Sequence, residues 1–260
     1  MDKITSTKKK PVDKIKLAKK MTPIIMLLPA IILICCTVLY PITKAIGYSF
    51  RYYKLTDLKN TSFIGLQNFI NILTNDDNFI RALINSLIWC GIIVPAQLII
   101  ALILSSILNS RFWGRGFIRS YILIPWFTPG VLIALMWKLI FSGTYGVLND
   151  ILIRIGIIQK NIPWLSSSYA FGCQMTVMIW QGVPFFTVML LAAMQTIPTY
   201  LYEAAEVEGA TKIQRFRYIT LPGIMTTLTT TFLIRIIWVY NNVDIIYNMT
   251  AGGPGTKSLT

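Results

Sequence analysis

Residues 203–222 read EAAEVEGATKIQRFRYITLP, the longest charged stretch inside an otherwise apolar chain. Pro198 precedes it and can occupy a first helical turn, where its missing N–H needs no partner. Gly209 ends the first short helix, because glycine reaches the left-handed C-terminal cap at the lowest cost. Thr211 and Gln214 have the spacing of a capping box, which begins a second short helix. The stretch therefore predicts a helix-turn-helix between two apolar segments.

The same stretch carries a pattern of seven fixed positions, which runs Glu-Ala-Ala, Gly six residues after the Glu, then Ile, and finally Leu-Pro. This pattern resembles the EAA loop of the membrane subunits of bacterial ABC importers. The resemblance implies that the loop, at residues 197–222, is cytoplasmic and docks into a cleft on a separate ATPase. The residues assigned to this coupling are Glu203, Ala204, Ala205, Gly209, Leu221 and Pro222. Without the resemblance, the stretch would be an ordinary loop with a helical turn.

The composition is that of a membrane protein. Hydrophobic residues make up 55% of the chain and charged residues 13%, against about 25% charged residues in globular proteins. Each long uncharged run can hold the roughly 20 residues that cross a bilayer as a helix; the runs are 21–43, 82–110, 120–137, 161–202 and 218–234. We therefore predict an all-α integral membrane protein with five transmembrane helices, and the resemblance implies the type I ABC-importer permease fold.

The net charge of +14 is explained by membrane topology rather than by nucleic acid binding. If the N-terminus is cytoplasmic, the inner segments 1–22, 109–119 and 197–220 hold 14 of the 24 lysine and arginine residues. We predict a basic cytoplasmic tail at residues 1–22, which contacts lipid headgroups. A transmembrane permease domain then covers residues 23–260.

The arrangements of residues that carry out catalysis are missing. The chain has no histidine, its four cysteines lie in apolar runs without metal-ligand spacing, and no Walker-type glycine loop is present. The sequence therefore predicts no enzyme activity, no metal site and no cofactor bound by this chain. The resemblance places ATP and Mg²⁺ in the partner ATPase subunits.

Two spans carry features beyond apolarity. Pro125, Pro129 and Gly130 fall within six residues, so the third span must be disturbed, either as a packing kink or to line a polar pathway. In the fourth span, Gln174, Gln181 and Phe185 share one helical face by spacing. Amides beside an aromatic ring suit a sugar, and they equally suit hydrogen bonds between helices.

Smaller segments extend the resemblance to the carbohydrate-uptake branch of the family, which includes the larger membrane subunit of the maltose transporter and sugar permeases of Gram-positive bacteria. These segments are residues 63–69 in the first outer loop, positions 143–165 in the second, and 244–254 at the end of the fifth span. The family normally adds a sixth span. Because this sequence stops at Thr260, we expect a fragment or a sixth helix from elsewhere.

The resemblance implies an importer of sugars in a bacterial cell membrane. The expected partners are a second permease subunit, two cytoplasmic ATPases and an extracellular substrate-binding protein. Sugar contacts known for the maltose subunit fall here, at unbroken spacing, on Trp126, Gly130, Gln181, Gly182, Phe185, Arg235, Trp238, Val239 and Asn242.

Arg235 is a charge near the middle of the fifth span, predicted at 221–247, where it is costly. In a continuous helix, Asp244 would lie nine residues further on and on the opposite face, too far to neutralise it. Arg235 then contacts a sugar that is acidic or dense in hydroxyls, or it pairs with the partner permease.

Three other classes of function compete with a sugar permease. The same architecture could import another solute, such as glycerol phosphate, an amino acid or a metal. A channel or ion-driven carrier would require membrane carboxylates or inverted repeats, and a membrane enzyme would require paired catalytic groups. The sequence shows neither set of features.

Overall fold

The computed structural model describes residues 12–54 and 56–252, and the chain divides into two compact units at the Asp76–Asp77 bond. The first unit begins with α1 (Val12–Ile34), a π-helical turn (Cys35–Leu39) and α2 (Tyr40–Ser49). Residues 21–49 are long and apolar enough to cross a membrane, as predicted for the first span. The helix starts earlier than expected, within the basic tail. Apolar side chains along this span are exposed, which suits contact with lipid.

A β-hairpin follows that the sequence did not predict. Strand β1 (Arg51–Lys54) pairs antiparallel with β2 (Asp57–Phe63), and α3 (Gln67–Asn75) completes the unit. The segment 63–69 holds this arrangement, because Asn68 Nδ2 donates hydrogen bonds to the carbonyl oxygens of Ser49 (2.9 Å) and Arg51 (3.0 Å). The motif is therefore structural in this unit, and the hairpin escaped prediction because its short strands lack an alternating apolar pattern.

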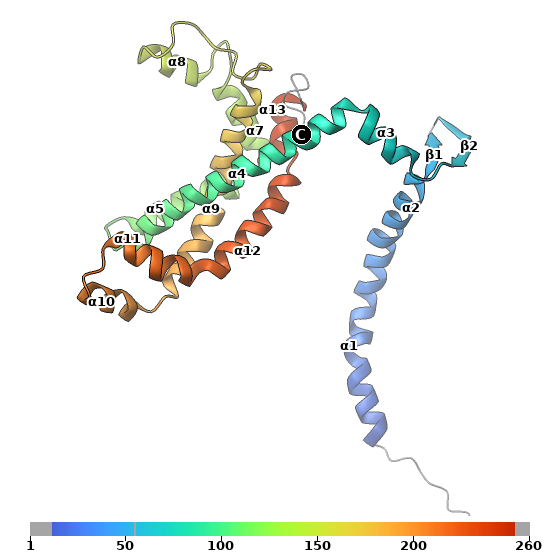
Figure 1. Ribbon diagram of the computed structural model, residues 1–260, viewed down its shortest axis with the longest axis horizontal. Coiled ribbons are helices and arrows are strands. Elements are labelled where there is room, and N and C mark those ends of the chain that lie inside the picture. The colour runs from blue at the N-terminus through green and yellow to red at the C-terminus, as the bar shows by residue number, and fades with distance from the viewer. Residues whose placement is uncertain (1–11, 55, 253–260) are drawn as a thin grey trace, which may run out of the picture. The chain divides into compact units, whose positions relative to one another are not determined.

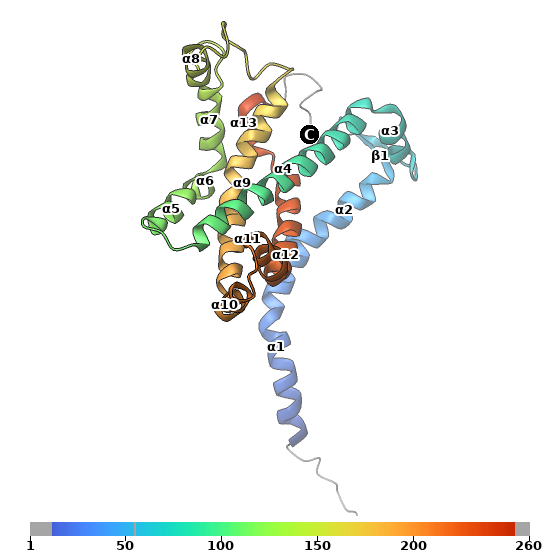
Figure 2. The same cartoon turned by 60° about the vertical axis from the view of Figure 1, so that its left-hand side comes forward.

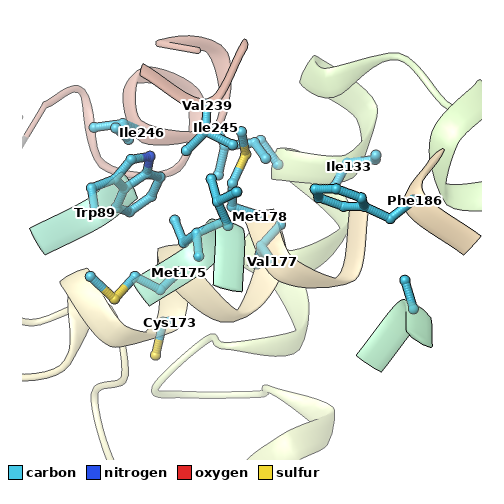
Figure 3. Packing of buried hydrophobic residues seen from close by; sticks show 14 of the residues in the cluster. Trp89, Ile133, Cys173, Met175, Val177, Met178, Phe186, Val239, Ile245 and Ile246 are labelled. Atoms are coloured by element: carbon cyan, nitrogen blue, oxygen red, sulfur yellow. The ribbon is translucent and has the colours of Figure 1, made fainter. Parts of the chain in front are cut away.

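The second unit is built on three long helices, α4 (Asp77–Asn109), α9 (Ala170–Gln195) and α12 (Leu221–Tyr240), which pack against one another (Figures 1 and 2). Their contact faces form the hydrophobic core. Figure 3 shows part of it, with Trp89 from α4, Met178 and Phe186 from α9, and Val239 from α12.

The third span is broken where the sequence predicted. Helices α5 (Arg115–Ile122) and α6 (Ile124–Phe127) end before Thr128 and Pro129, whose ψ angles are 129° and 136°. Helix α7 (Gly130–Ile140) then leaves with a bend of 96°. Pro129 cannot donate a backbone bond and disfavours the helical conformation of Thr128 before it. With this bent pair counted as one span, the described part of the chain has the five spans predicted.

The loop after α7 is held by one asparagine. Helix α8 (Val147–Arg154) places Asn149, which is 2% exposed, among loop backbone groups. Its Oδ1 accepts hydrogen bonds from Ile162 N (3.1 Å) and Trp164 Nε1 (2.9 Å), and its Nδ2 donates to the carbonyls of Ser142 (3.3 Å) and Ile162 (3.0 Å). Gly146 has no space for a side chain, because a Cβ would overlap the Ser142 carbonyl oxygen. The residues of this loop that match the family therefore hold the loop in place. We call Asn149 and its four hydrogen bonds the latch.

The fifth span is not one continuous helix to residue 247, as the sequence analysis expected. A π-helical turn (Phe216–Thr220) leads into α12, which ends at Tyr240, and α13 (Asp244–Thr250) begins after a break. The side-chain amide of Asn241 donates to the Ile237 carbonyl (2.8 Å), and such local bonds disfavour helix continuation. The described residues end at Gly252, so the rest of the Gly-Gly-Pro segment and the question of a sixth span lie outside them.

Two short helices, α10 (Thr199–Val207) and α11 (Lys212–Arg215), connect α9 to α12. They lie at one end of the second unit, whereas α8 and α13 lie toward the other end (Figures 1 and 2).

Candidate functional site

The loop between α9 and α12 has the helix-turn-helix form that the sequence predicted. Helix α10 ends before Gly209, whose φ is +77°, a value that few residues other than glycine adopt. Helix α11 begins with a complete capping box. Gln214 N donates to Thr211 Oγ1 (3.3 Å), and Thr211 N donates to Gln214 Oε1 (2.7 Å).

Two side-chain contacts brace this loop. Arg215 Nη1 lies 2.9 Å from Glu206 Oε2 and joins α11 to α10. The hydroxyl groups of Tyr202 and Thr220 lie 2.9 Å apart and join α10 to the turn that precedes α12. The two contacts therefore connect α10 and α11 to each other and connect α10 to the start of α12.

The surface of the loop combines small and apolar groups. Glu203, Ala204 and Gly209 are exposed, and Ala205 is half-buried. Near them in sequence, Val207 is 90% exposed, and Ile213 and Tyr218 are also exposed. Leu221 and Pro222 form the first turn of α12. Exposed apolar side chains beside small residues are a surface that another protein can cover.

A second candidate site is a polar cavity of about 420 Å³ near the break between α12 and α13. Its lining comes from α6, α9, the end of α12 and the residues that follow it. The lining residues are Trp126, Gln181, Arg235, Trp238, Asn241, Asn242, Val243 and Asp244.

Most of the sugar-contact residues predicted from the resemblance meet at this cavity. Five of them line it directly, namely Trp126, Gln181, Arg235, Trp238 and Asn242. Phe185 is not itself a lining residue but packs against both indoles, with its ring centroid 5.8 Å from that of Trp126 and 4.9 Å from that of Trp238.

The other three predicted residues do not line the cavity. Gly182 packs against Arg235 and Gly130 against Asp244, because a Cβ built on each glycine would meet that side chain. Val239 is fully buried in the hydrophobic core (Figure 3), and it is not among the residues that line the cavity. Helical spacing predicted that Val239 shares a face of the helix with Arg235. Part of that face packs into the hydrophobic core, and only part of it lines the cavity.

Arg235 is held by a residue that the sequence analysis missed. Its Nε donates a 2.8 Å hydrogen bond to Oε1 of Gln97 on α4, and Gln97 Nε2 donates to the Met178 carbonyl on α9 (2.7 Å). The guanidinium carbon of Arg235 also lies 6.0 Å from the Trp238 ring centroid. The sequence gives little indication of this role, because Gln97 is a single amide within a long apolar run.

Asp244 reaches the cavity because the helix breaks before it, which corrects the expectation that it lies on an opposite face. Its Cβ lies 3.4 Å and its Oδ2 3.5 Å from where a Cβ of Gly130 would stand. Gly130 is the first residue of α7. The carboxylate therefore lies at the positive end of that helix dipole.

Gln174 has a different role from Gln181. It is fully buried, and its Nε2 donates to Thr250 Oγ1 of α13 (2.8 Å). This is the bond between helices that the sequence analysis weighed against sugar contact.

Comparison with known proteins finds relatives that are permease components of transport systems. Residues 97–260 match the family model of the binding-protein-dependent transport system inner membrane component. The chain is 36% identical to a sulfoquinovosyl glycerol transport system permease of Agrobacterium fabrum, over 94% of this chain and 79% of that protein. It is 32% identical to a trehalose/maltose transport system permease of Thermococcus litoralis, over 94% and 81%.

A solved structure agrees with these relatives. A bacterial ABC transporter involved in the import of the acidic polysaccharide alginate matches with a TM-score of 0.77 and 26% identity, over 94% of this chain and 82% of that one. The predicted fold class is thereby confirmed. The chain belongs to the family of binding-protein-dependent ABC transporter inner membrane components and is a multi-pass permease subunit of the cell membrane, not itself an ATPase.

Proposed function

We propose that this permease subunit forms part of the translocation pathway of an ATP-driven importer of sugars or oligosaccharides. It works with a second permease subunit, two cytoplasmic ATPases and an extracellular substrate-binding protein. ATP and Mg²⁺ belong to the ATPases. In this arrangement the N-terminus and the α10–α11 loop are cytoplasmic.

The cavity beside α12 and α13 carries this proposal. Its aromatic part consists of the Trp126 and Trp238 indoles, and the buried Phe185 ring packs against both of them. Its polar part includes the amides of Gln181, Asn241 and Asn242. Aromatic faces pack against the C–H faces of sugar rings, and amides exchange hydrogen bonds with hydroxyls. The names of several relatives also refer to sugars.

The loop formed by α10 and α11 couples the pathway to ATP. Its exposed residues Glu203, Ala204 and Gly209 would enter a cleft on the ATPase, and its apolar side chains would be covered there. Closure of the ATPase pair on ATP would draw the loops of the two permeases together. The braces to α12 would carry this movement to the cavity, because the same helix holds Arg235 and Trp238.

One observation favours an alternative solute of the same importer class. Arg235 brings a positive charge to the cavity, which would also suit a small anion such as glycerol phosphate. Such a solute has no sugar ring that could pack against the two indoles of the cavity.

The test is uptake by the complete transporter with its binding protein, reconstituted in proteoliposomes. Neutral and acidic oligosaccharides are compared with glycerol phosphate. We expect the wild-type transporter to take up saccharides, and we expect Trp238→Ala to lower this uptake about tenfold or more. The control is Trp113→Ala, which removes a fully exposed indole and should leave uptake unchanged. Uptake of glycerol phosphate but of no saccharide would contradict the proposal.

A further inference from the structure

We propose that Gln97 positions Arg235 as a fixed cation that recognises an acidic group on the transported saccharide. The inference rests on the proposed carbohydrate function. It adds a substrate class, which is a saccharide bearing a carboxylate or sulfonate, and it adds a positioning residue outside the cavity.

The side chain of Gln97 is held in one orientation. This side chain is fully buried and uses both ends of its amide. Its oxygen accepts from Arg235 Nε, and its nitrogen donates to the Met178 carbonyl. Rotation of the amide by 180° would place donor against donor and acceptor against acceptor. Gln97 therefore has one satisfied orientation, and that orientation fixes the guanidinium group.

The guanidinium group of Arg235 packs against α9 on one side. A Cβ built on Gly182 would overlap Nη2 of Arg235 and the amide of Gln97. The backbone of α9 at Gly182 thus packs directly against both side chains. Arg235 is only 6% exposed, and it lines the cavity. Because Nε is bound to Gln97 and Nη2 packs against α9 at Gly182, a ligand can meet only the part of the guanidinium group that lines the cavity.

The positive charge of Arg235 favours a negatively charged ligand. In the part of the chain that the structure describes, Arg235 forms no ion pair. Asp244 lines the same cavity, but its carboxylate lies against the first residue of α7 and is compensated there. An amide would suffice to bind a neutral hydroxyl. A buried, unpaired cation is unfavourable by itself and favours an anionic ligand.

Asn242 favours hydroxyl groups on the rest of the ligand. Asn242 Oδ1 is buried and accepts no hydrogen bond from the described residues. An unmatched acceptor beside the cavity favours a ligand that also has donors. Sugar hydroxyls supply donors, whereas inorganic anions without protons do not. The cavity therefore fits a saccharide with an acidic group better than a small anion.

The experiment uses the complete transporter and its binding protein in proteoliposomes. The probes are di- to tetrasaccharides of galacturonate, glucuronate and mannuronate, and the same oligosaccharides with their carboxyl groups reduced to alcohols. The variants are Arg235→Gln and Gln97→Glu. The control is Arg154→Gln, which removes an exposed arginine paired with Asp150.

We expect the wild-type transporter to prefer the acidic probes. Arg235→Gln should lower the uptake ratio of acidic to reduced probes by about tenfold or more. Gln97→Glu keeps an acceptor for Arg235 Nε but pairs the cation with a carboxylate. It should raise KM for the acidic probes with little change for the reduced ones, a split that a merely structural role would not produce. Arg154→Gln should keep the wild-type ratio.

Three results would overturn the inference, and they are distinguishable. Uptake of the reduced probes alone by the wild type would remove the acidic specificity and leave the carbohydrate function standing. Uptake of neither set would reject both. An equal fall for both probe sets in the two variants, together with loss of the second permease on co-purification, would assign Arg235 to subunit pairing instead.

Discussion

The hydroxyl oxygen of Tyr202 lies 2.9 Å from that of Thr220, so α10 is tied to the turn from which α12 begins. Arg235 lies 15 residues further along, about 22 Å at 1.5 Å per residue. The proposed ATPase-docking loop and the cavity are thus joined by one helix. A displacement of α10 would reach the cavity as a movement of α12, without passing through a flexible connection.

The first prediction concerns this contact. Tyr202→Phe removes the hydroxyl and leaves the ring, so we expect a loss of about 0.5–1.5 kcal/mol in the local tie and a weaker link between ATP hydrolysis and transport. The measurement is the number of ATP molecules hydrolysed for each sugar imported by the complete transporter. Tyr200→Phe, in which an exposed tyrosine of the same helix loses its hydroxyl, is the control. An unchanged ratio in Tyr202→Phe would show that the tie carries no coupling.

The second prediction concerns Gly209. Its positive φ makes valine unfavourable there by about 1–2 kcal/mol, although a Cβ would meet no neighbouring atom within 4 Å. Gly114 is a matched control, because its φ is +84° and its surroundings are equally open. We expect Gly209→Val to reduce uptake while the protein remains in the membrane, and Gly114→Val to retain uptake. Both uptake and membrane abundance are measured. Similar uptake in the two variants would argue that Gly209 matters only for backbone strain.

The third prediction concerns the latch after α7. Asn149→Ala would remove four hydrogen bonds and leave the Trp164 indole N–H without its partner. We expect a loss of about 2 kcal/mol or more in stability. The exposed Asn161 makes one 3.4 Å bond in the same loop, so Asn161→Ala should change stability by less than about 0.5 kcal/mol. Thermal unfolding of the detergent-solubilised complex distinguishes them. Equal unfolding temperatures would mean that the latch does not stabilise the loop.

The fourth prediction concerns the isolated chain. Because the chain has no phosphate-binding glycine loop, we expect no ATP hydrolysis when it is purified without partners. The addition of the two ATPase subunits and the second permease should restore turnover that depends on the binding protein. ATP turnover that persists after every separate ATPase has been removed would be incompatible with a permease subunit.

The sequence by itself determined the local features. Apolar runs located the spans, because a bilayer demands about 20 residues that satisfy their own backbone bonds. Pro125 and Pro129 predicted the broken third span, and Gly209 with the Thr211–Gln214 capping box predicted the form of the α10–α11 loop. Each depends on residues within a few positions of one another, so the chemistry of the stretch was sufficient.

Only the tertiary structure decided which distant groups meet. The hydrogen bond between Gln97 and Arg235 joins residues 138 positions apart. Helical spacing grouped Val239 with Arg235, yet Val239 faces the core, and the break after Tyr240 brought Asp244 to the cavity. Periodicity tells which residues share a face of a helix. Which neighbour covers that face depends on how α4, α9 and α12 pack, and that is set by all of their side chains together.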